Sequence, residues 1–188
     1  MSNKIKWKPG TLLAPVPAVL VSCGTLENPN ALTIAWTGIV NSTPPMTYVS
    51  VRPSRYSYEL IKNSGEFVIN LTNKPLLKAT DLCGVKSGKD GDKFKLCGIT
   101  AAESFEVAAP SIAESPVSVE CKVTDIIKLG SHDMFLAQIV AVAVDEQYVS
   151  EAGKLRLDKA GLFAYSHGEY FELGKRLGSF GYSVRKKK

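Results

Sequence analysis

The sequence predicts a mainly β fold, a β-barrel with peripheral helices, in one domain that covers residues 1–188. Three observations support this prediction. Strand-like runs outnumber helical ones, they do not alternate regularly with helices, and 188 residues suit a single domain with one core. A doubly wound parallel sheet is therefore disfavoured, and we expect flexible ends over about residues 1–13 and 183–188.

Six runs rich in apolar and β-branched residues predict the strands of this barrel. They cover residues 18–22, 32–36, 46–51, 67–71, 117–127 and 134–144. The alternation is clearest in VSVECKV, which starts at Val117 and places its apolar residues on one face.

Two segments have the boundaries of helices. Residues 54–63 begin at Ser54, a candidate N-cap, and Gly65 follows just past their end. Residues 74–83 end before Gly84, which predicts a second helix that stops there. Both helices are expected on the periphery of the barrel.

Composition argues against several classes of function. The formal net charge is +5, but residues 185–188 contribute four of these charges, so a nucleic-acid partner has little support. Four scattered cysteines without a C-x-x-C pair, with only two histidines, predict reduced thiols and no metal site. The apolar run 134–144 is too short to span a bilayer, so we expect a soluble, cytoplasmic protein without a membrane partner.

The N-terminus resembles a signal peptide, with Lys4, Lys6 and Lys8 ahead of an apolar stretch that ends at Cys23. Two prolines interrupt this stretch. We therefore expect it to belong to the fold and not to a secretion signal.

The segment 29–57, PNALTIAWTGIVNSTPPMTYVSVRPSRYS, is the most informative part of the chain. Its first strand ends on the indole of Trp36, and Arg52-Pro-Ser-Arg55 opens a helix. A helix N-terminus with arginine and serine side chains forms an anion site. An aromatic side chain beside an anion site points to a phosphorylated, planar heteroaromatic ligand, and hence to flavin mononucleotide (FMN).

Each part of this segment also has a plainer interpretation. Trp36 alone can be a core residue, Ser54 only an N-cap, and Arg52 or Arg55 a solvated cation. The glycine fingerprints of dinucleotide and phosphate loops are absent from the sequence. The FMN hypothesis therefore rests on the combination of the aromatic side chain, the serine and the two arginines in one segment.

Six motifs in order resemble the flavin reductase-like, FMN-binding split-barrel proteins, particularly their flavoredoxin branch, over about residues 14–174. They are N-A-L-T-I-A-W, an S-x-x-P turn, R-P-S-R-Y-S, F-V-I-N-L, D-K-F and G-x-H-x-x-x-x-A-x-I-V. The resemblance implies a split barrel of Greek-key type, non-covalent FMN, and a homodimer with FMN near its interface. A split barrel leaves an apolar face that a second copy can cover.

The resemblance also assigns the cofactor-binding residues. Asn30, Thr33, Ala35, Trp36 and Thr37 match the block at the flavin ring and ribityl chain, and Arg52, Ser54, Arg55 and Ser57 match the phosphate end. The full set is Asn30, Thr33, Ala35, Trp36, Thr37, Ser42, Arg52, Ser54, Arg55, Ser57, Lys93 and Tyr165.

Three of the later residues have alternative roles. Lys93, the last residue of the polar loop 85–93, is either a cation for reduced flavin or phosphate or an ordinary loop lysine. Tyr165 and Tyr170 either approach the flavin or pack in the core or an interface.

His132 is the one catalytic candidate, on the nicotinamide side. Many relatives carry Gly-Asp-His here, whereas this chain has Gly130-Ser131-His132, with the aspartate following as Asp133. The sequence therefore does not identify the residue that orients the histidine. The alternative is that the histidine has only a structural role.

The resemblance implies an FMN-binding oxidoreductase, an NAD(P)H-dependent flavin reductase that transfers a hydride from nicotinamide to flavin. Without a Rossmann fingerprint, NAD(P)H is expected to bind only transiently, as co-substrate. The alternatives are a flavoredoxin-like electron carrier, reduced by a redox protein partner, and a flavin-binding module without redox turnover.

Overall fold

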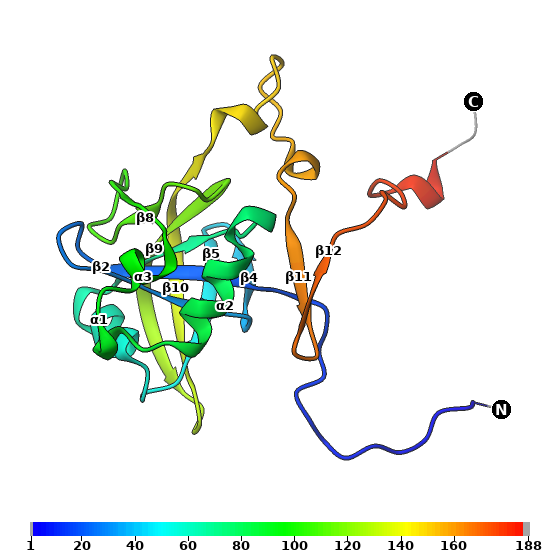
Figure 1. The fold of residues 1–188 in the computed structure, drawn as a ribbon. Coiled ribbons are helices and arrows are strands. Elements are labelled where there is room, and N and C mark those ends of the chain that lie inside the picture. The colour runs from blue at the N-terminus through cyan, green and yellow to red at the C-terminus, as the bar shows by residue number, and fades with distance from the viewer. Residues whose placement is uncertain (1, 186–188) are drawn as a thin grey trace.

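A seven-stranded antiparallel sheet forms the body of the computed structural model, which describes residues 2–185 (Figure 1). Its strands run in the order β3 (Pro29–Ile34), β2 (Val19–Gly24), β6 (Glu66–Asn70), β9 (Val117–Lys128), β10 (Asp133–Val144), β5 (Pro45–Val51) and β4 (Thr37–Ser42). Several spatial neighbours are not consecutive in sequence, which is typical of Greek-key connections.

The two edge strands of this sheet, β3 and β4, follow each other directly in the chain. Ala35 and Trp36 join them, and the backbone N–H of Ser50 in β5 donates to the carbonyl of Trp36 at 3.0 Å. The sheet therefore curls until its edges meet at Trp36 without closing completely. The predicted mainly β, split-barrel fold is confirmed.

The alternation of β2 divides the apolar residues between two layers. Val19, Val21 and Cys23 point into the barrel, where helix α1 (Tyr56–Ser64) packs. Leu20 points to the other face, where it is covered by helices α2 (Leu77–Val85) and α3 (Lys93–Cys97). Helix α1 in the first layer and helices α2 and α3 in the second carry residues of the candidate site.

The boundaries of both predicted helices need correction. The first begins at Tyr56 and not at Ser54, because Arg55 has an extended backbone and occupies the N-cap position without a side-chain hydrogen bond. Its predicted end is confirmed, since Gly65 adopts a left-handed conformation with φ of 69°. The second continues through Gly84, where a Cβ would lie 3.5 Å from that of Thr33. Gly84 thus allows α2 to approach β3.

Several elements were not predicted. Strand β4 replaces an expected polar turn, and its hairpin with β5 turns at Thr43 and Pro44. The others are β1 (Val16–Pro17), β7 (Ala101–Ala102), β8 (Ser111–Ile112), β11 (Phe163–Ser166), β12 (Glu169–Glu172), α3 and the short 3₁₀ helices Gly88–Asp90, Glu146–Tyr148, Leu157–Lys159 and Tyr182–Val184. The 3₁₀ helix Lys74–Leu76 forms the start of the helical segment predicted over residues 74–83. Strands β1, β11 and β12 form a separate small sheet.

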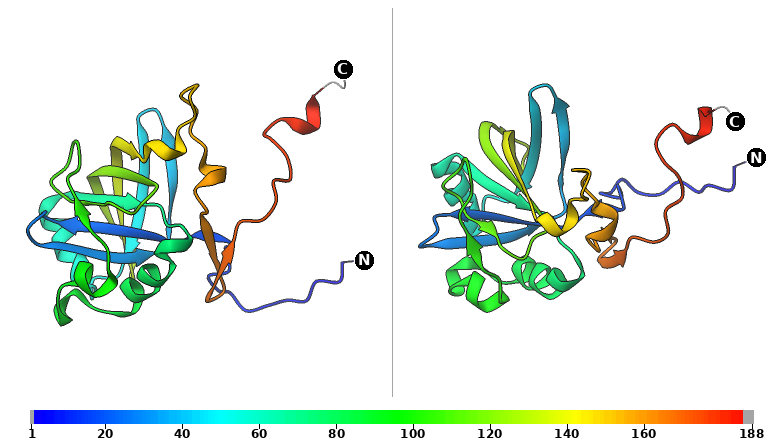
Figure 2. Two further views of the ribbon diagram at one scale, coloured as in Figure 1. Left: turned by 45° about the horizontal axis from the view of Figure 1, so that its top comes forward. Right: turned by 90° about the horizontal axis from the view of Figure 1, so that it is seen from above.

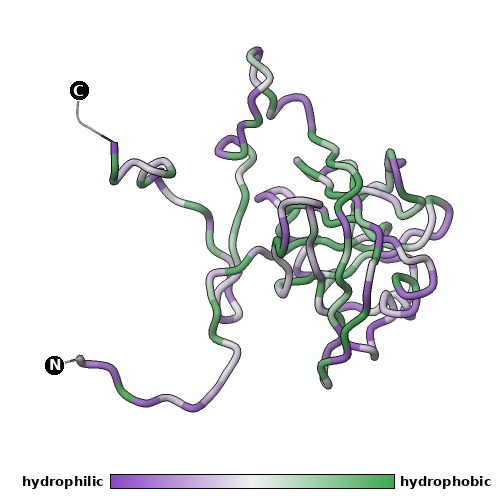
Figure 3. The backbone as a smooth tube through the Cα atoms, turned by 180° about the vertical axis from the view of Figure 1, so that it is seen from behind, coloured by the Kyte–Doolittle hydropathy of each residue, from purple (hydrophilic) through white to green (hydrophobic). Residues whose placement is uncertain are grey.

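The segments before β1 and after β12 run away from the body of the molecule (Figures 1 and 2). Hydrophobic stretches recur along both segments (Figure 3). The expectation of flexible ends is not tested, and residues 1 and 186–188 lie outside the described residues. Within residues 2–185, no helix is long and apolar enough to cross a membrane.

Candidate functional site

Two adjoining hollows lie where β3, β5 and the start of α1 converge. Their volumes are about 390 and 360 Å³, and both are lined by Leu32, Arg52 and Arg55. Together they reach the size of ordinary small-molecule sites. Their linings differ in chemistry, so we name them the aromatic hollow and the basic hollow.

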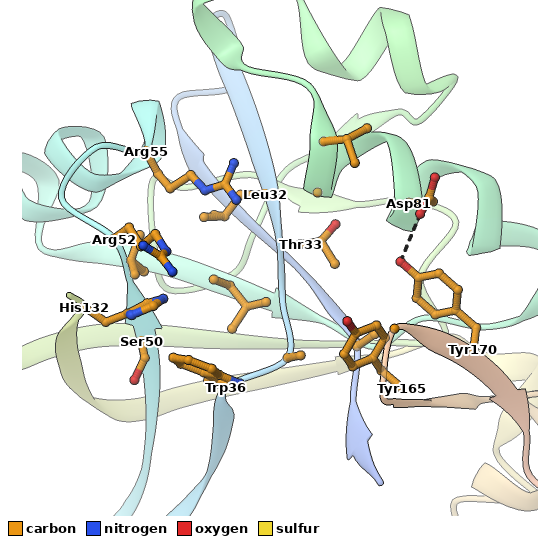
Figure 4. Close-up of a pocket in the computed structure, with 17 residues that line it drawn as sticks. Leu32, Thr33, Trp36, Ser50, Arg52, Arg55, Asp81, His132, Tyr165 and Tyr170 are labelled. Atoms are coloured by element: carbon orange, nitrogen blue, oxygen red, sulfur yellow. Dashed lines mark hydrogen bonds between the residues drawn. The ribbon is translucent and has the colours of Figure 1, made fainter. Parts of the chain in front are cut away.

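The aromatic hollow, the larger of the two, has aromatic side chains on opposite walls (Figure 4). On one wall Trp36 and His132 pack together in a tilted arrangement, with ring centroids 4.5 Å apart and planes inclined by 46°. On the other, Tyr165 of β11 lies 5.6 Å from Tyr170 of β12, whose hydroxyl donates to Asp81 of α2 at 3.3 Å. A planar ring could enter between these walls.

The basic hollow collects four cations, from Arg52, Arg55, Lys86 and Lys93. Serine hydroxyls accompany them, from Ser54, Ser57 and Ser87, and none of the described lining residues is acidic. The N-terminus of α1 opens here, and no side chain caps it. Its backbone N–H groups and the surrounding cations make this hollow suitable for an anion.

A buried hydrogen bond holds the first turn of α1 against β3. Asn30 of β3 donates from Nδ2 to Oγ of Ser57 at 2.6 Å, and both side chains are buried. Asn30 therefore supports the basic hollow from behind, although it does not line it.

Lys93 is the first residue of α3 and not part of a loop. Asp92 caps this helix, and the Lys93 ammonium donates to the backbone carbonyl of Cys83 at 2.8 Å. Burial lowers the pKa of Lys93, and the charge of Arg55 acts in the same direction. An anion in the basic hollow would favour the charged form.

His132 has Ser131 as its neighbour in place of an aspartate. The Ser131 hydroxyl lies 3.0 Å from Nδ1 of His132. Asp133 is buried and accepts a 2.6 Å hydrogen bond from the Tyr58 hydroxyl, which raises the pKa of Tyr58 to about 12. Asp133 is thus engaged in the core, and Ser131 is the side chain that contacts the histidine.

The two arginines also affect His132. Partial burial lowers the pKa of His132 below its ordinary value of 6.5, and the charges of Arg52 and Arg55 lower it further. Both effects favour the neutral imidazole.

Most of the residues predicted for the site line the two hollows. The aromatic hollow contains Thr33, Ala35, Trp36, Arg52, Arg55, His132 and Tyr165, and the basic hollow contains Arg52, Ser54, Arg55, Ser57 and Lys93.

Asn30, Thr37 and Ser42 lie outside both hollows. The Thr37 hydroxyl donates to the carbonyl of Tyr48 at 2.5 Å, within the β4–β5 hairpin. Ser42 is exposed at the far end of this hairpin, opposite Pro45. Strand β4 carries both residues away from the site.

The structure adds residues that were not in the predicted set, including Asp81, Lys86, Ser87, Gly88 and Tyr170. The polar loop 85–93 was the signal for Lys86, Ser87 and Gly88 in the sequence, because such loops face ligands. Gly88 is required there, since a Cβ would lie 2.3 Å from Cδ1 of Tyr56 and 2.5 Å from Oδ1 of Asn30. Within residues 2–185, no cluster of three or more histidine, cysteine or acidic side chains could hold a metal ion.

Comparisons with known proteins agree with this geometry. The family described as "Flavin reductase like domain" matches residues 12–174. An uncharacterized protein of Archaeoglobus fulgidus is 34% identical over 130 residues, which are 69% of this chain and 73% of that protein.

Two solved structures are similar along nearly their whole length. The flavoredoxin of Desulfovibrio vulgaris (Miyazaki F) is 30% identical, with a TM-score of 0.89, over 97% of this chain and all of that one. The flavoredoxin of Methanosarcina acetivorans is 28% identical, with a TM-score of 0.88, over 98% of this chain and all of that one. The chain therefore belongs to the flavin reductase-like family, in its flavoredoxin branch.

Proposed function

We propose that the protein binds FMN across the two hollows and acts as an NAD(P)H-dependent flavin reductase. Membership of the family supports the more general conclusion that the protein binds a flavin and takes part in redox chemistry. The observation that carries the choice of FMN is the continuity of an aromatic hollow with a basic one through Arg52 and Arg55. A flavin with a terminal phosphate matches both ends.

The phosphate would be held by the hydroxyls of Ser54 and Ser57, the N-terminus of α1 and the two arginines. The flavin ring would lie near Trp36 and the backbone around Ala35. Bound FMN supplies a hydride acceptor, and the protein supplies alignment and a favourable electrostatic environment.

The nicotinamide would approach beside the tilted ring pair of Trp36 and His132, which lies on the wall of the aromatic hollow. A hydrogen bond donated by the Ser131 hydroxyl to Nδ1 would leave the imidazole proton on Nε2, and His132 could then donate it to a ligand. We propose this positioning role for His132 and assign no general acid or base.

The visible spectrum and anaerobic reduction test this function. We expect the purified protein to show flavin absorbance, or to gain it on addition of FMN, and stopped-flow mixing with NADH or NADPH to bleach it. Denatured protein with the same amount of free FMN is the control. Failure of both nicotinamides to bleach bound flavin contradicts the reductase, and failure to bind FMN contradicts any flavin function.

A second candidate is an electron carrier, which the similarity to two flavoredoxins over nearly the whole chain favours. In that case bound FMN is reduced slowly by both nicotinamides and rapidly by a reduced redox protein. Equally slow reduction by every protein donor would exclude the carrier. A flavin-binding module without turnover would bind FMN and be reduced by none of these donors.

We also propose a homodimer, in the cytoplasm, where the four free cysteines stay reduced. Apolar side chains on the terminal segments support a second copy as the partner, since Leu13 is 88% and Leu177 98% exposed and Phe180 is fully exposed. Leu12 and Leu13 also border Trp36 and Tyr165, so the partner would lie close to the aromatic hollow.

Sedimentation equilibrium tests the dimer. We expect twice the chain mass of 20.3 kDa for the protein at micromolar concentration, and a weaker dimer for the double variant Leu177→Ser, Phe180→Ser. Leu26→Ser is a control on a different exposed apolar side chain. A wild-type monomer at these concentrations would exclude the proposal.

The pH dependence of His132 follows from its two arginine neighbours. We expect an NMR titration midpoint below 6.5, so that the neutral form predominates at pH 7 and is lost only as the pH falls through the lowered pKa. Arg55→Met should raise the midpoint, because it removes a positive charge. Arg156→Met, outside both hollows, is the control, and an unchanged midpoint in Arg55→Met would contradict this account.

A further inference from the structure

Two thiols meet beside the basic hollow. The sulfur of Cys83, near the end of α2, lies 3.2 Å from the sulfur of Cys97, the last residue of α3. Both cysteines are free in this structure, and the proposed flavin chemistry uses neither. The nearness of two thiols on different helices is what separates this pair from an isolated buried cysteine.

We propose that Cys83 and Cys97 form a redox-active pair that a hydroperoxide oxidises to a disulfide, which closes the chain around the loop of the basic hollow. The segment between the two cysteines, residues 84–96, runs from the end of α2 into α3 and includes the lining residues Lys86, Ser87 and Gly88. A bond between the cysteines would fix both ends of this segment.

Lys93 couples the pair to the anion site. Lys93 belongs to the segment that the bond would enclose, and its ammonium donates to the carbonyl of Cys83 at 2.8 Å. Lys93 and Cys83 both line the basic hollow. The bond would therefore tie the ends of α2 and α3 together at the residues that present a cation to the hollow.

The surroundings of the two sulfurs give them different roles. Cys97 is only partly buried, so an oxidant can reach it. Cys83 is buried, and burial together with the hydrogen bond to Cys97 raises its pKa to about 12. Since the thiolate is the reactive species, Cys97 reacts first and Cys83 resolves.

The chemistry balances with hydrogen peroxide as the oxidant. The Cys97 thiolate attacks one peroxide oxygen, the O–O bond breaks, and Cys97 sulfenic acid forms with release of hydroxide. The Cys83 sulfur then attacks the Cys97 sulfur, the S–S bond forms, the S–O bond breaks, and the oxygen leaves as water with the Cys83 proton. In total, two thiols lose two electrons and two protons, and peroxide becomes two waters.

The movement required is small. A disulfide bond measures about 2.05 Å, so the sulfurs must approach by roughly 1.2 Å. The other two cysteines are internal controls, because Cys23 and Cys121 are both fully buried in the barrel core. Burial raises the pKa of Cys23 to about 11 and that of Cys121 to about 12.

Peptide mapping of the full-length protein tests the bond. The protein is treated with hydrogen peroxide, unfolded, alkylated without reductant and digested with trypsin, which cleaves between the two cysteines at Lys86, Lys89, Lys93 and Lys95. We expect the peptides of Cys83 and Cys97 to stay linked until dithiothreitol is added, while Cys23 and Cys121 are alkylated. Cys97→Ser should give no linked peptide.

Two results would overturn the proposal. In the first, Cys83 and Cys97 are both fully alkylated after peroxide treatment. In the second, Cys97 is converted to sulfinic acid without a linked peptide. Both are read on the wild-type protein, so they do not depend on the folding of a variant.

The effect on the hollow is measured through FMN release, and this second measurement rests on the proposed function. We expect FMN to dissociate roughly threefold more slowly from the oxidised protein than from the reduced protein, because a fixed loop is preorganised for the ligand. Peroxide should not change the rate in Cys97→Ser. An equal rate in both forms overturns the coupling, whereas absence of FMN binding refutes the proposed function and leaves the linked peptide as support for the thiol pair.

Discussion

The hydrogen bond from Asn30 to Ser57 is the contact on which the candidate site depends. It joins β3 to the first turn of α1 at 2.6 Å between two buried side chains. Breaking it would leave a buried donor without its partner, at a cost of about 1–3 kcal/mol. Because Arg52 and Arg55 lie just before α1, the same contact sets them beside Leu32 of β3, where the two hollows meet. The bend that carries Trp36 and the N-terminus of α1 therefore belong to one continuous wall of the candidate site.

The electrostatics of this wall favour a negatively charged ligand. Arg52, Arg55 and Lys93 converge on the basic hollow without an acidic residue among its described lining. The charge of Arg55 also lowers the pKa of Lys93 and of His132, so electrostatic repulsion from this arginine acts on groups in both hollows. A bound phosphate would offset this repulsion. The thiol pair of Cys83 and Cys97 lies beside the same cations, so a disulfide between them would restrict the movement of the residues that line the basic hollow.

Much of this arrangement could be predicted from the sequence, where a local pattern carried the information. Alternation indicated the central strands, and R-P-S-R with an upstream indole pointed to residues that line both hollows. Strand β4 was missed because four of its six residues are exposed and it lacks alternation. Thr37 and Ser42, which the family resemblance placed at the cofactor, lie outside the hollows. The contact of Tyr170 with Asp81 and that of Cys83 with Cys97 join distant segments, and no local pattern predicts such contacts.

The central claim is that one ligand spans the aromatic and basic hollows with a phosphate in the basic one. The most direct test compares the affinities of FMN and riboflavin, which differ only in that phosphate, by quenching of flavin fluorescence. With two or more charge-assisted hydrogen bonds to the phosphate, FMN should bind at least about 100-fold more tightly. Equal affinity for FMN and riboflavin would contradict the account, because the basic hollow would then contribute nothing to binding.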